Sequence, residues 1–406
     1  MKRNAVTNLI EWKESGTTVP FLLVGTKGTG KTYLAMEFAN SYYPQYLYVN
    51  FELNLGAKLF FEEKIQSGAS VSEAIAAYFQ MEERYLTELI VILDEISFCP
   101  ILWKALTEEI TVPLLAISGI LPSVEDTKFC LCRLFPLGFD EFLSAVGNDW
   151  YIDIIQGHFQ NLKPVPDIVH QELLALFEEY LIVGGMPAAV NEYISSKSVY
   201  NVSEIHSMVK CRMQSVLETL YDEKESGKGV QVLQVLPEQL KKENKKFRFN
   251  LIRKGVTYSL YKDSIDALVQ SGLVLRLNEQ KKESHFKLYL PDVGMLSSAF
   301  CGGDSEEEKK AILENYVMQT LVANGITSLC FWESEAQAKV DFIFKKNEQE
   351  TPVELRISTN GKAKSIASYQ TSNGKIGESY YRFGFENFYS TSVMTQVPYY
   401  AVFCIK

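Results

Sequence analysis

The sequence predicts an α/β fold built on a parallel, doubly wound sheet, and three observations support this. A complete G-x-x-x-x-G-K-T loop at 25–32 joins an apolar run at 21–24 to a segment with helical spacing. A second apolar run at 89–93 ends in two acidic residues, Asp94 and Glu95. Other apolar runs alternate with helical stretches, at 46–50, 112–117 and 129–135. Such alternation is typical of a parallel sheet that binds its ligand at the carboxyl ends of the strands.

The glycine loop predicts a phosphate-binding site of the Walker A type. Its glycines let consecutive backbone N–H groups face an anion, and the following helix points its positive N-terminus at the same place. We expect Lys31 to reach the β- and γ-phosphates and the Thr32 hydroxyl to bind Mg²⁺. The candidate nucleotide-binding residues are Gly25, Thr26, Lys27, Gly28, Thr29, Gly30, Lys31, Thr32 and Tyr33.

The acidic pair after the second apolar run predicts a Walker B motif. Five consecutive apolar residues fit a strand that is buried on both faces of a parallel sheet. Asp94 ends this strand and is placed to hold Mg²⁺ through water, and Glu95 is placed to polarise the attacking water. Ser118 closes the next strand, where it is either a sensor of the γ-phosphate or a serine in a turn.

Length, composition and charge set the class of protein. A chain of 406 residues predicts two or three domains, and 47% apolar with 22% charged residues predicts an ordinary folded core. The net charge of -10 argues against a protein coated in nucleic acid or held on anionic membranes by bulk charge. Seven scattered cysteines without metal-ligand spacing indicate reduced thiols, and no apolar run reaches the ~18 residues of a membrane span. We therefore expect a cytoplasmic protein.

The middle of the chain predicts a helical region followed by a winged helix. Gly184-Gly185-Met186-Pro187 is expected to turn between two helices, and the charged stretch 221–229 is expected to be a flexible joint. Downstream, a helical segment, an amphipathic helix at 258–272 and a strand at 273–277 follow the winged-helix order.

Seven basic residues between 241 and 254 form a local positive run in an acidic protein. Lys241, Lys242, Lys245 and Lys246 are the candidates for contacts with DNA phosphates, which would confer little sequence specificity. The alternative is a solvated face, or a surface that docks onto the acidic remainder of the chain.

The last hundred residues carry a spaced set of acids, after a polar break at 302–308. Glu314 is expected on a helix, and Asp341 and Glu354 on two strands. Two such carboxylates with a lysine two residues after the second form the metal site of endonuclease-like folds. Here the residue is Arg356, which stays protonated and cannot accept a proton, and Lys339 adds a cation beside Asp341. We expect a degenerate site without nuclease activity, kept as a binding or structural module.

These motifs together resemble a family, the bacterial and archaeal AAA-type ATPases with a C-terminal restriction-endonuclease-like domain. The resemblance covers nearly the whole chain, and departures from the usual pattern occur at Lys27, Gly28, Ser97 and Ile120. It rests on the loop at 25–32, on 94–96, on Cys99-Pro100, on 135–143 and on 181–187. It implies a P-loop AAA-type domain at 1–146, a helical lid at 147–220, a winged-helix-like domain at 221–300 and a small endonuclease-like α/β domain at 301–406.

The function expected from the residues and the resemblance is ATP binding with Mg²⁺-dependent hydrolysis. Nucleotide state would then drive movement of C-terminal modules that bind DNA or a protein partner. Two alternatives stay open, an ATP-gated metal-dependent nuclease and a non-hydrolysing nucleotide switch. The sequence does not identify an arginine finger, although Lys128 and Arg133 lie in the expected region; a finger donated by another copy would imply an oligomer.

Overall fold

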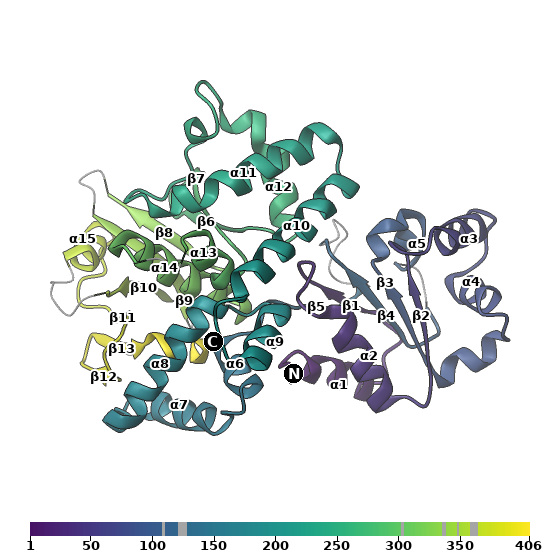
Figure 1. The fold of residues 1–406 in the computed structure, drawn as a ribbon, viewed down its shortest axis with the longest axis horizontal. Helices are drawn as coiled ribbons and strands as arrows, with labels where there is room; N and C mark the ends of the chain where they lie inside the picture. The colour runs from purple at the N-terminus through teal and green to yellow at the C-terminus, as the bar shows by residue number, and fades with distance from the viewer. Residues whose placement is uncertain (108–109, 121–127, 302–303, 335–337, 347–348, 358–363) are drawn as a thin grey trace. The chain divides into compact units, whose positions relative to one another are not determined.

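A computed structural model of the chain describes all residues except 108–109, 121–127, 302–303, 335–337, 347–348 and 358–363 (Figure 1). The chain forms two compact units. The P-loop unit comprises 2–135 together with 270–272, and the second unit comprises 136–269 and 273–406 with Met1. Part of the polar break predicted at 302–308, Gly302 and Gly303, lies outside the described residues.

The P-loop unit contains a five-stranded sheet in which every pairing is parallel, in the order β2-β3-β4-β1-β5. The predicted strands are therefore confirmed; β1 and β2 have the predicted bounds, and the ends of the other three differ by one or two residues. Their bounds are β1 Phe21–Val24, β2 Tyr46–Asn50, β3 Ile90–Asp94, β4 Leu114–Ser118 and β5 Cys130–Arg133. Because β1 lies between β4 and β5, the loop after β1 opens at the point where the strand order reverses, which is where such sheets bind ligands.

Alternating strand residues bury both faces of this sheet. Leu23 and Ile92 pack with the helices on one face, and Leu22 and Val91 pack with those on the other. The first face is covered by α1 (Val6–Glu14) and α2 (Lys31–Tyr42), and the second by α3 (Leu55–Gln66), α4 (Val71–Tyr78) and α5 (Pro100–Ala105). Short 3-10 turns, η1 (Glu83–Glu88) and η2 (Ile96–Phe98), flank β3. This is the doubly wound arrangement that the apolar runs predicted.

The second unit begins with helices and ends with a mixed sheet. Its helices are α6 (Phe139–Ala145), α7 (Trp150–Asn161), α8 (Asp167–Val183), α9 (Pro187–Ser196), α10 (Val202–Leu220), α11 (Glu223–Lys241), α12 (Tyr258–Gln270), α13 (Val293–Ala299), α14 (Glu306–Ala323) and α15 (Lys364–Ser372), with 3-10 turns η4 (Phe249–Leu251) and η5 (Tyr399–Cys404). The predicted turn at 184–187 is confirmed, since α8 ends at Val183 and α9 begins at Pro187.

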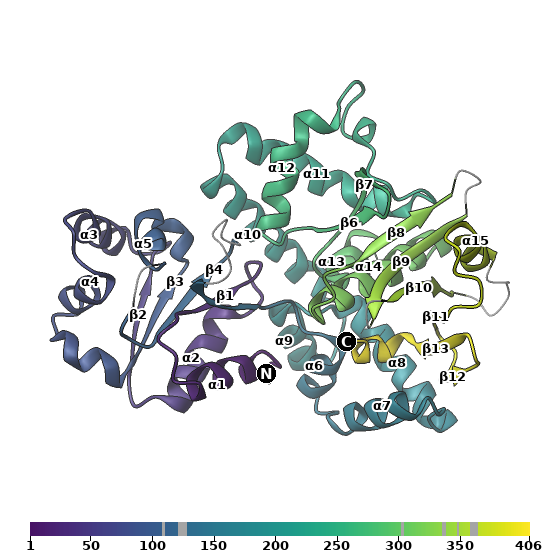
Figure 2. The ribbon, with the colours of Figure 1, turned by 180° about the vertical axis from the view of Figure 1, so that it is seen from behind.

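The sheet of the second unit has eight strands in the order β12-β13-β11-β10-β9-β8-β6-β7 (Figure 2). They are β6 (Leu275–Glu279), β7 (Lys282–Tyr289), β8 (Cys330–Glu333), β9 (Lys339–Lys346), β10 (Gln349–Leu355), β11 (Tyr380–Gly384), β12 (Tyr389–Ser390) and β13 (Met394–Pro398). The hairpin β6–β7 is joined to the rest because β6 pairs in parallel with β8. One sheet therefore crosses the boundary predicted at 300–301, and the division of this unit into three domains stays a prediction.

The flexible joint predicted at 221–229 is wrong. Helix α10 ends at Leu220 and α11 starts at Glu223, so only two residues separate the helices. The Asp222 side chain caps α11 by accepting a hydrogen bond from the Glu225 N–H, and Glu225 pairs with Lys228 one turn later. These charged residues are local helix-stabilising groups, which composition alone does not distinguish from a solvated linker.

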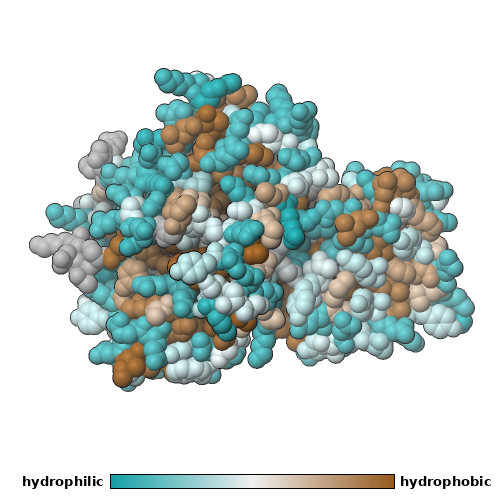
Figure 3. All heavy atoms as spheres, in the orientation of Figure 1, coloured by the Kyte–Doolittle hydropathy of each residue, from teal (hydrophilic) through white to brown (hydrophobic). Residues whose placement is uncertain are grey.

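Hydrophilic and hydrophobic residues are interspersed over the face shown in Figure 3. Among the helices in the described part of the chain, none combines the length and the apolar character needed to cross a membrane.

Candidate functional site

The glycine loop between β1 and α2 is shaped by close backbone approach. Gly28 and Gly30 have φ values of 93° and 90°, a region that favours glycine. A Cβ on Gly25 would collide with the Leu134 carbonyl oxygen. Gly30 is also the N-cap of α2 and has no side chain to cap it, so the first N–H groups of α2 have no side-chain cap. The loop therefore offers N–H groups to an anion, as a phosphate site requires.

Lys31 lies under this loop. Its ammonium is buried and donates to the carbonyl oxygen of Gly25 at 2.7 Å and to that of Thr26 at 3.3 Å. Burial lowers the pKa of Lys31 below its usual value, and the carboxylates of Glu95 and Asp94 oppose this. Within the described residues these two bonds go to neutral carbonyl oxygens, and a buried cation so placed is suited to an anionic ligand that would complete its pairing.

Asp94 lies at the centre of a hydrogen-bond network at the carboxyl end of β3. Its Oδ2 accepts hydrogen bonds from the Thr32 hydroxyl at 2.8 Å, the Tyr48 hydroxyl at 2.8 Å and the Asn50 amide at 3.2 Å. Its Oδ1 accepts one from the Glu95 N–H at 2.9 Å. Burial, with the Asp94 carboxylate beside it, raises the pKa of Tyr48 to about 12, so the phenol stays a donor.

Glu95 adopts a left-handed conformation with φ of 50°, and its side chain is buried. Burial raises the pKa of the Glu95 carboxyl, and the nearby Lys31 ammonium opposes this rise. Positive φ is uncommon for a glutamate, and strained residues of this kind are concentrated at functional sites. A carboxylate with a raised pKa next to a phosphate loop can accept a proton from water.

Three other residues shape the loop. The Lys27 ammonium is ion-paired with Glu52. Arg3, from the first residues of the chain, donates to the Thr29 carbonyl oxygen at 2.8 Å and to the Phe135 carbonyl oxygen at 2.5 Å. The Ser118 hydroxyl donates to the Ile120 carbonyl oxygen at 2.7 Å and accepts from its N–H at 3.0 Å, so both of its bonds are made within its own turn.

The donor set fits a magnesium–nucleotide complex. The Thr32 hydroxyl and the Asp94 carboxylate are oxygen donors 2.8 Å apart, and Mg²⁺ prefers oxygen ligands in proteins. The structure thus brings Lys31, Thr32, Asp94 and Glu95 together at one end of the sheet. Their roles in binding and catalysis stay predictions, as does the role of Ser118.

No sequence motif points to Tyr48, Asn50 or Arg3 as residues of the site. Alternation in the strand at 46–50 puts residues 48 and 50 on one face at its carboxyl end, a signal that could have identified both. Nothing in the sequence near Arg3 points to a loop that follows β1.

The acids of the predicted degenerate site in the second unit are paired with cations. Glu314 is buried and pairs with the ammonium groups of Lys245 and Lys287, and it also accepts from the Tyr289 hydroxyl at 2.5 Å. Asp341 pairs with Lys287 at 3.3 Å. Although burial alone would raise it, the pKa of Glu314 is held well below its usual value by the two lysines.

Glu354 is likewise paired, with Arg356 at 3.1 Å and with Arg382 at 2.8 Å. Two unit charges 4 Å apart at an effective dielectric constant of 20 interact with ~4 kcal/mol, and a divalent ion doubles this. A metal ion among these carboxylates would face that repulsion from each ammonium. No cluster of three or more His, Cys, Asp or Glu residues suited to a metal occurs in the described ranges. The residues present do not fit a divalent cation.

The predicted DNA patch is partly an internal ion-pair set. Lys245 is buried against Glu314, which removes it from any surface patch. Lys246 pairs with Glu279 and Glu333, and Lys241 pairs with Glu238 and Glu308. Lys242 is exposed. The lysines at 241–246 therefore dock largely onto acidic residues, as the alternative interpretation of this run expected.

Three glycine-containing segments of the second unit meet at one buried point, which we call the glycine junction: 137–138, 184–185 and 292–294. The Leu137 N–H donates to the Gly185 carbonyl oxygen at 2.7 Å, and the Tyr180 hydroxyl donates to the Leu137 carbonyl oxygen at 2.7 Å. The Gly185 N–H donates to Asp292 at 2.6 Å. A Cβ on Gly185 would lie 2.6 Å from the Leu137 nitrogen, so only glycine allows this approach.

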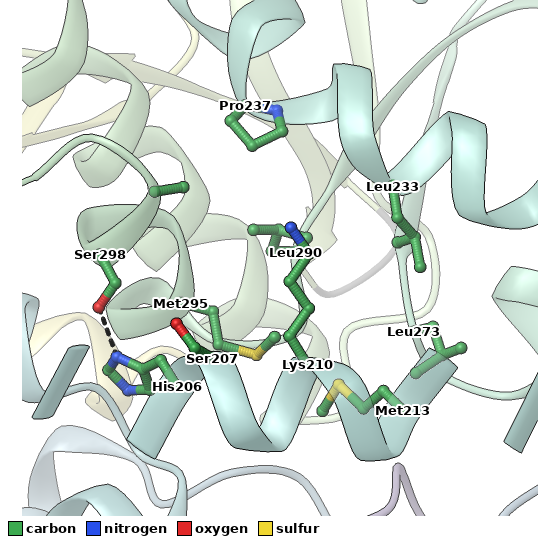
Figure 4. Close-up of a pocket in the computed structure, with 11 residues that line it drawn as sticks. His206, Ser207, Lys210, Met213, Leu233, Pro237, Leu273, Leu290, Met295 and Ser298 are labelled. Carbon is green, nitrogen blue, oxygen red and sulfur yellow. Dashed lines mark hydrogen bonds between the residues drawn. The ribbon is translucent and has the colours of Figure 1, made fainter. Parts of the chain in front are cut away.

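A small cavity of about 110 Å³ adjoins the glycine junction, lined by Met213, Leu233, Leu290 and Met295 with Lys210 among them (Figure 4). At one side His206 accepts from the Ser298 hydroxyl at 2.6 Å and donates to the Val183 carbonyl oxygen at 3.0 Å. Burial lowers the pKa of His206 to about 4, so the imidazole is neutral.

Comparisons with known proteins identify a nucleotide-binding domain. Residues 18–113 match the model of an AAA domain. Residues 174–307 and 309–396 each match a domain of unknown function, DUF8612 and DUF4143. No curated protein matches the chain. The AAA match supports an ATP-binding ATPase of the P-loop AAA type, as the sequence predicted, and the winged-helix and endonuclease-like interpretations stay predictions.

Several solved structures are similar. A Walker-type ATPase of Pyrococcus abyssi is 14% identical with a TM-score of 0.43, over 73% of this chain and 95% of that one. PCH-2 of C. elegans is 16% identical with a TM-score of 0.30, and the match covers 53% of this chain and 66% of PCH-2. A signal-transduction ATPase with numerous domains, from Pyrococcus horikoshii, is 14% identical with a TM-score of 0.29, and the match covers 80% of this chain and 45% of that ATPase. With TM-scores below 0.5, these likenesses say nothing of function.

Proposed function

We propose that the P-loop unit hydrolyses ATP slowly with Mg²⁺, and that its nucleotide state changes the conformation of the second unit. The observation that carries the proposal is the hydrogen bond between Thr32 and Asp94 beside the buried ammonium of Lys31. Mg²⁺ bound there would neutralise charge on the phosphate oxygens.

Each residue of the site has a separate task in this proposal. Lys31 and the loop N–H groups bind the phosphates, and Thr32 with Asp94 holds the metal. Tyr48 and Asn50 orient Asp94 by donating to its Oδ2. Glu95 accepts the proton of the attacking water, a role for which its raised pKa suits it.

The segment 134–137 connects the phosphate loop to the second unit along the chain. Within the P-loop unit, the Leu134 N–H donates to Val24 at 2.7 Å, and Arg3 joins the Phe135 carbonyl oxygen to that of Thr29 in the phosphate loop. Two residues later, Leu137 is fixed in the glycine junction of the second unit. A shift of the phosphate loop is therefore connected, through very few backbone bonds, to a buried, hydrogen-bonded point of the other unit.

The first experiment measures steady-state ATP turnover of the wild type and of Glu95→Gln, with and without DNA. We expect slow turnover in the wild type and its loss in Glu95→Gln with nucleotide binding retained. Glu37→Gln, an exposed position on α2, is the control. Absence of turnover in the wild type under all conditions would refute hydrolysis and favour the non-hydrolysing switch. Stimulation by DNA would identify DNA as the partner.

A second experiment tests the link. Insertion of three glycines between Pro136 and Leu137 lengthens the connection and replaces no residue of the phosphate loop or of the glycine junction. We expect nucleotide to change hydrogen exchange at 180–190 in the wild type but not in the insertion variant, with turnover preserved. The same exchange response in both proteins would refute coupling through this segment.

The ATP-gated nuclease is the less favoured function because its carboxylates are already paired with lysine and arginine. A plasmid-nicking assay with Mg²⁺ or Mn²⁺ tests it directly. Cleavage that is lost in Asp341→Ala would establish the nuclease and contradict our assignment of this site.

A further inference from the structure

A second polar cavity, of about 310 Å³, lies in the second unit among β9, β10, α14, α15 and the segment that follows α11. Its lining includes the three acids Glu314, Asp341 and Glu354, so it occupies the place where an endonuclease-like fold would hold a metal. Cavities of this size suit small ligands or the charged end of a larger one.

Six lysines line this cavity: Lys245, Lys246, Lys287, Lys310, Lys339 and Lys364. Lys245 is paired with Glu314, and Lys246 is paired with Glu333. Lys287 is paired with both Glu314 and Asp341. Lys310, Lys339 and Lys364 have no ion pair among the residues described. Glu243 is the one acid of the lining that has no ion pair with a described residue.

The charge balance at the cavity is therefore positive although the protein is acidic. Among the described residues, the lining has three lysines without ion pairs but one carboxylate without an ion pair, that of Glu243. The charge of Glu354 is neutralised by Arg356 and Arg382. Two buried lysines of the lining, Lys245 and Lys287, do not use all of their N–H groups in hydrogen bonds to described residues. An ammonium has three N–H groups, and Lys245, which is 4% exposed, uses one of them on Glu314. Lys287 uses two, on Glu314 and Asp341.

We propose that this cavity binds a phosphate monoester directly through lysine, in place of a metal. Glu314, Asp341 and Glu354 hold the inner cations in position and do not bind a metal. Lys310, Lys339 and Lys364 supply the charge that the ligand neutralises. This site is separate from the ATP site and does not depend on the function proposed for it.

The ligand must be anionic and must accept several hydrogen bonds at one centre. Phosphate oxygens meet both conditions, because lysine binds phosphate as a point charge with several donors. Such a phosphate occurs either on a free nucleotide or at the 5′ end of a DNA strand. The chemistry of the cavity is the same for both sources, so binding experiments must distinguish them.

The test measures pyrophosphate binding by calorimetry in the Lys31→Ala full-length chain, without divalent ions and at about 50 mM salt, where charge screening is moderate. The Lys31→Ala background weakens the phosphate loop, so failure of this site and failure of the ATP site give different results. We expect one pyrophosphate per chain, unchanged by EDTA. No binding, or binding that needs Mg²⁺, would overturn the proposal.

The lysines are tested by charge reversal. Lys310→Glu and Lys339→Glu are each expected to weaken binding at least tenfold, because they replace attraction with repulsion at a partly exposed site. Lys309→Glu is the matched control, since Lys309 is the exposed neighbour of Lys310 on α14 and does not line the cavity. Equal binding by all three variants would overturn the proposal, and unchanged circular dichroism would show that the fold is intact.

AMP and matched oligonucleotides with a 5′-phosphate or a 5′-hydroxyl then identify the source. Tighter binding of the phosphorylated oligonucleotide than of AMP assigns the cavity to DNA ends. Binding of AMP alone assigns it to free nucleotides. Equal binding of the two oligonucleotides, with none of AMP, would overturn the assignment to a phosphate monoester.

Discussion

Replacement of Asp292 by asparagine should change the pH dependence of stability. The carboxyl is fully buried in the glycine junction, where Oδ2 accepts from the Gly185 N–H at 2.6 Å and Oδ1 from the Met295 N–H at 3.2 Å. Burial raises the pKa of Asp292 from 3.8 to about 6, and hydrogen bonds from backbone N–H groups only partly oppose this. An asparagine has nearly the same shape but cannot ionise.

The size and sign of the effect follow from the two pKa values. Between pH 3.8 and 6 the folded protein holds a proton on Asp292 that the unfolded chain has released, so wild-type stability falls as the pH rises. A gap of about two units corresponds to ~3 kcal/mol, since one unit is worth ~1.4 kcal/mol. Because the unfolded carboxyl is already more than half ionised at pH 4, the wild type should lose about 2.4 kcal/mol of this relative to Asp292→Asn between pH 4 and pH 7.

The assay is urea unfolding of both proteins at several pH values between 4 and 7, followed by circular dichroism. The difference between the two proteins reports on Asp292 together with its neighbour His206, whose Nε2 lies 3.9 Å from Asp292 Oδ1, because distant groups titrate alike in both. Asp153→Asn, at an exposed position on α7, is the control and should show no such trend. The reasoning would be refuted if the difference in the free energy of unfolding stayed constant with pH. It would also be refuted if the wild type became more stable relative to Asp292→Asn as the pH rises.

Three further variants test other contacts. Gly185→Ala should lower the free energy of unfolding by about 3 kcal/mol or more, because a Cβ has no room beside Leu137 and adjacent hydrogen bonds would be strained. Gly157→Ala in α7 is the control, and it should stabilise by ~0.5–1 kcal/mol because the space around Gly157 is open. Thermal unfolding measures both effects. Tyr48→Phe should slow ATP turnover about tenfold with little change in nucleotide affinity, since a hydrogen bond to a carboxylate contributes ~1.5–3 kcal/mol. An equal loss of turnover in Tyr46→Phe would argue against a specific role of the Tyr48 hydroxyl in orienting Asp94. Lys31→Met should weaken ATP binding at least about 100-fold in a fluorescent-nucleotide titration, as expected when a buried cation for phosphate is lost, and undiminished affinity would contradict the site.

The phosphate site could be predicted in detail because its signals are local. The loop at 25–32 specifies its own turn through glycine, and α2 follows directly at Lys31. The apolar run before Asp94 has the length and burial of a central strand. The strands of the parallel sheet end at one edge, which brings Asp94 after β3 to Thr32 after β1 even though β4 lies between these strands.

The partners of the charged residues could not be predicted in this way. Lys245 belongs to a basic run but is buried against Glu314, which is 69 residues away in sequence. Arg3 reaches Phe135 across 132 residues. A lysine on a DNA-binding face and a lysine in an internal ion pair have the same local sequence, because the choice depends on which elements pack together.

By itself, the sequence determined the α/β class, the parallel sheet of the P-loop unit and the residues of its phosphate loop. These depend on spacing over a few residues, where backbone geometry leaves few alternatives. Only the tertiary structure decided that one sheet joins the hairpin β6–β7 to the C-terminal strands, and that Lys245 and Lys287 pair with an acid of the expected degenerate site. The reason is physical, since the pKa and the pairing of a buried charge depend on neighbours that the fold brings from distant parts of the chain.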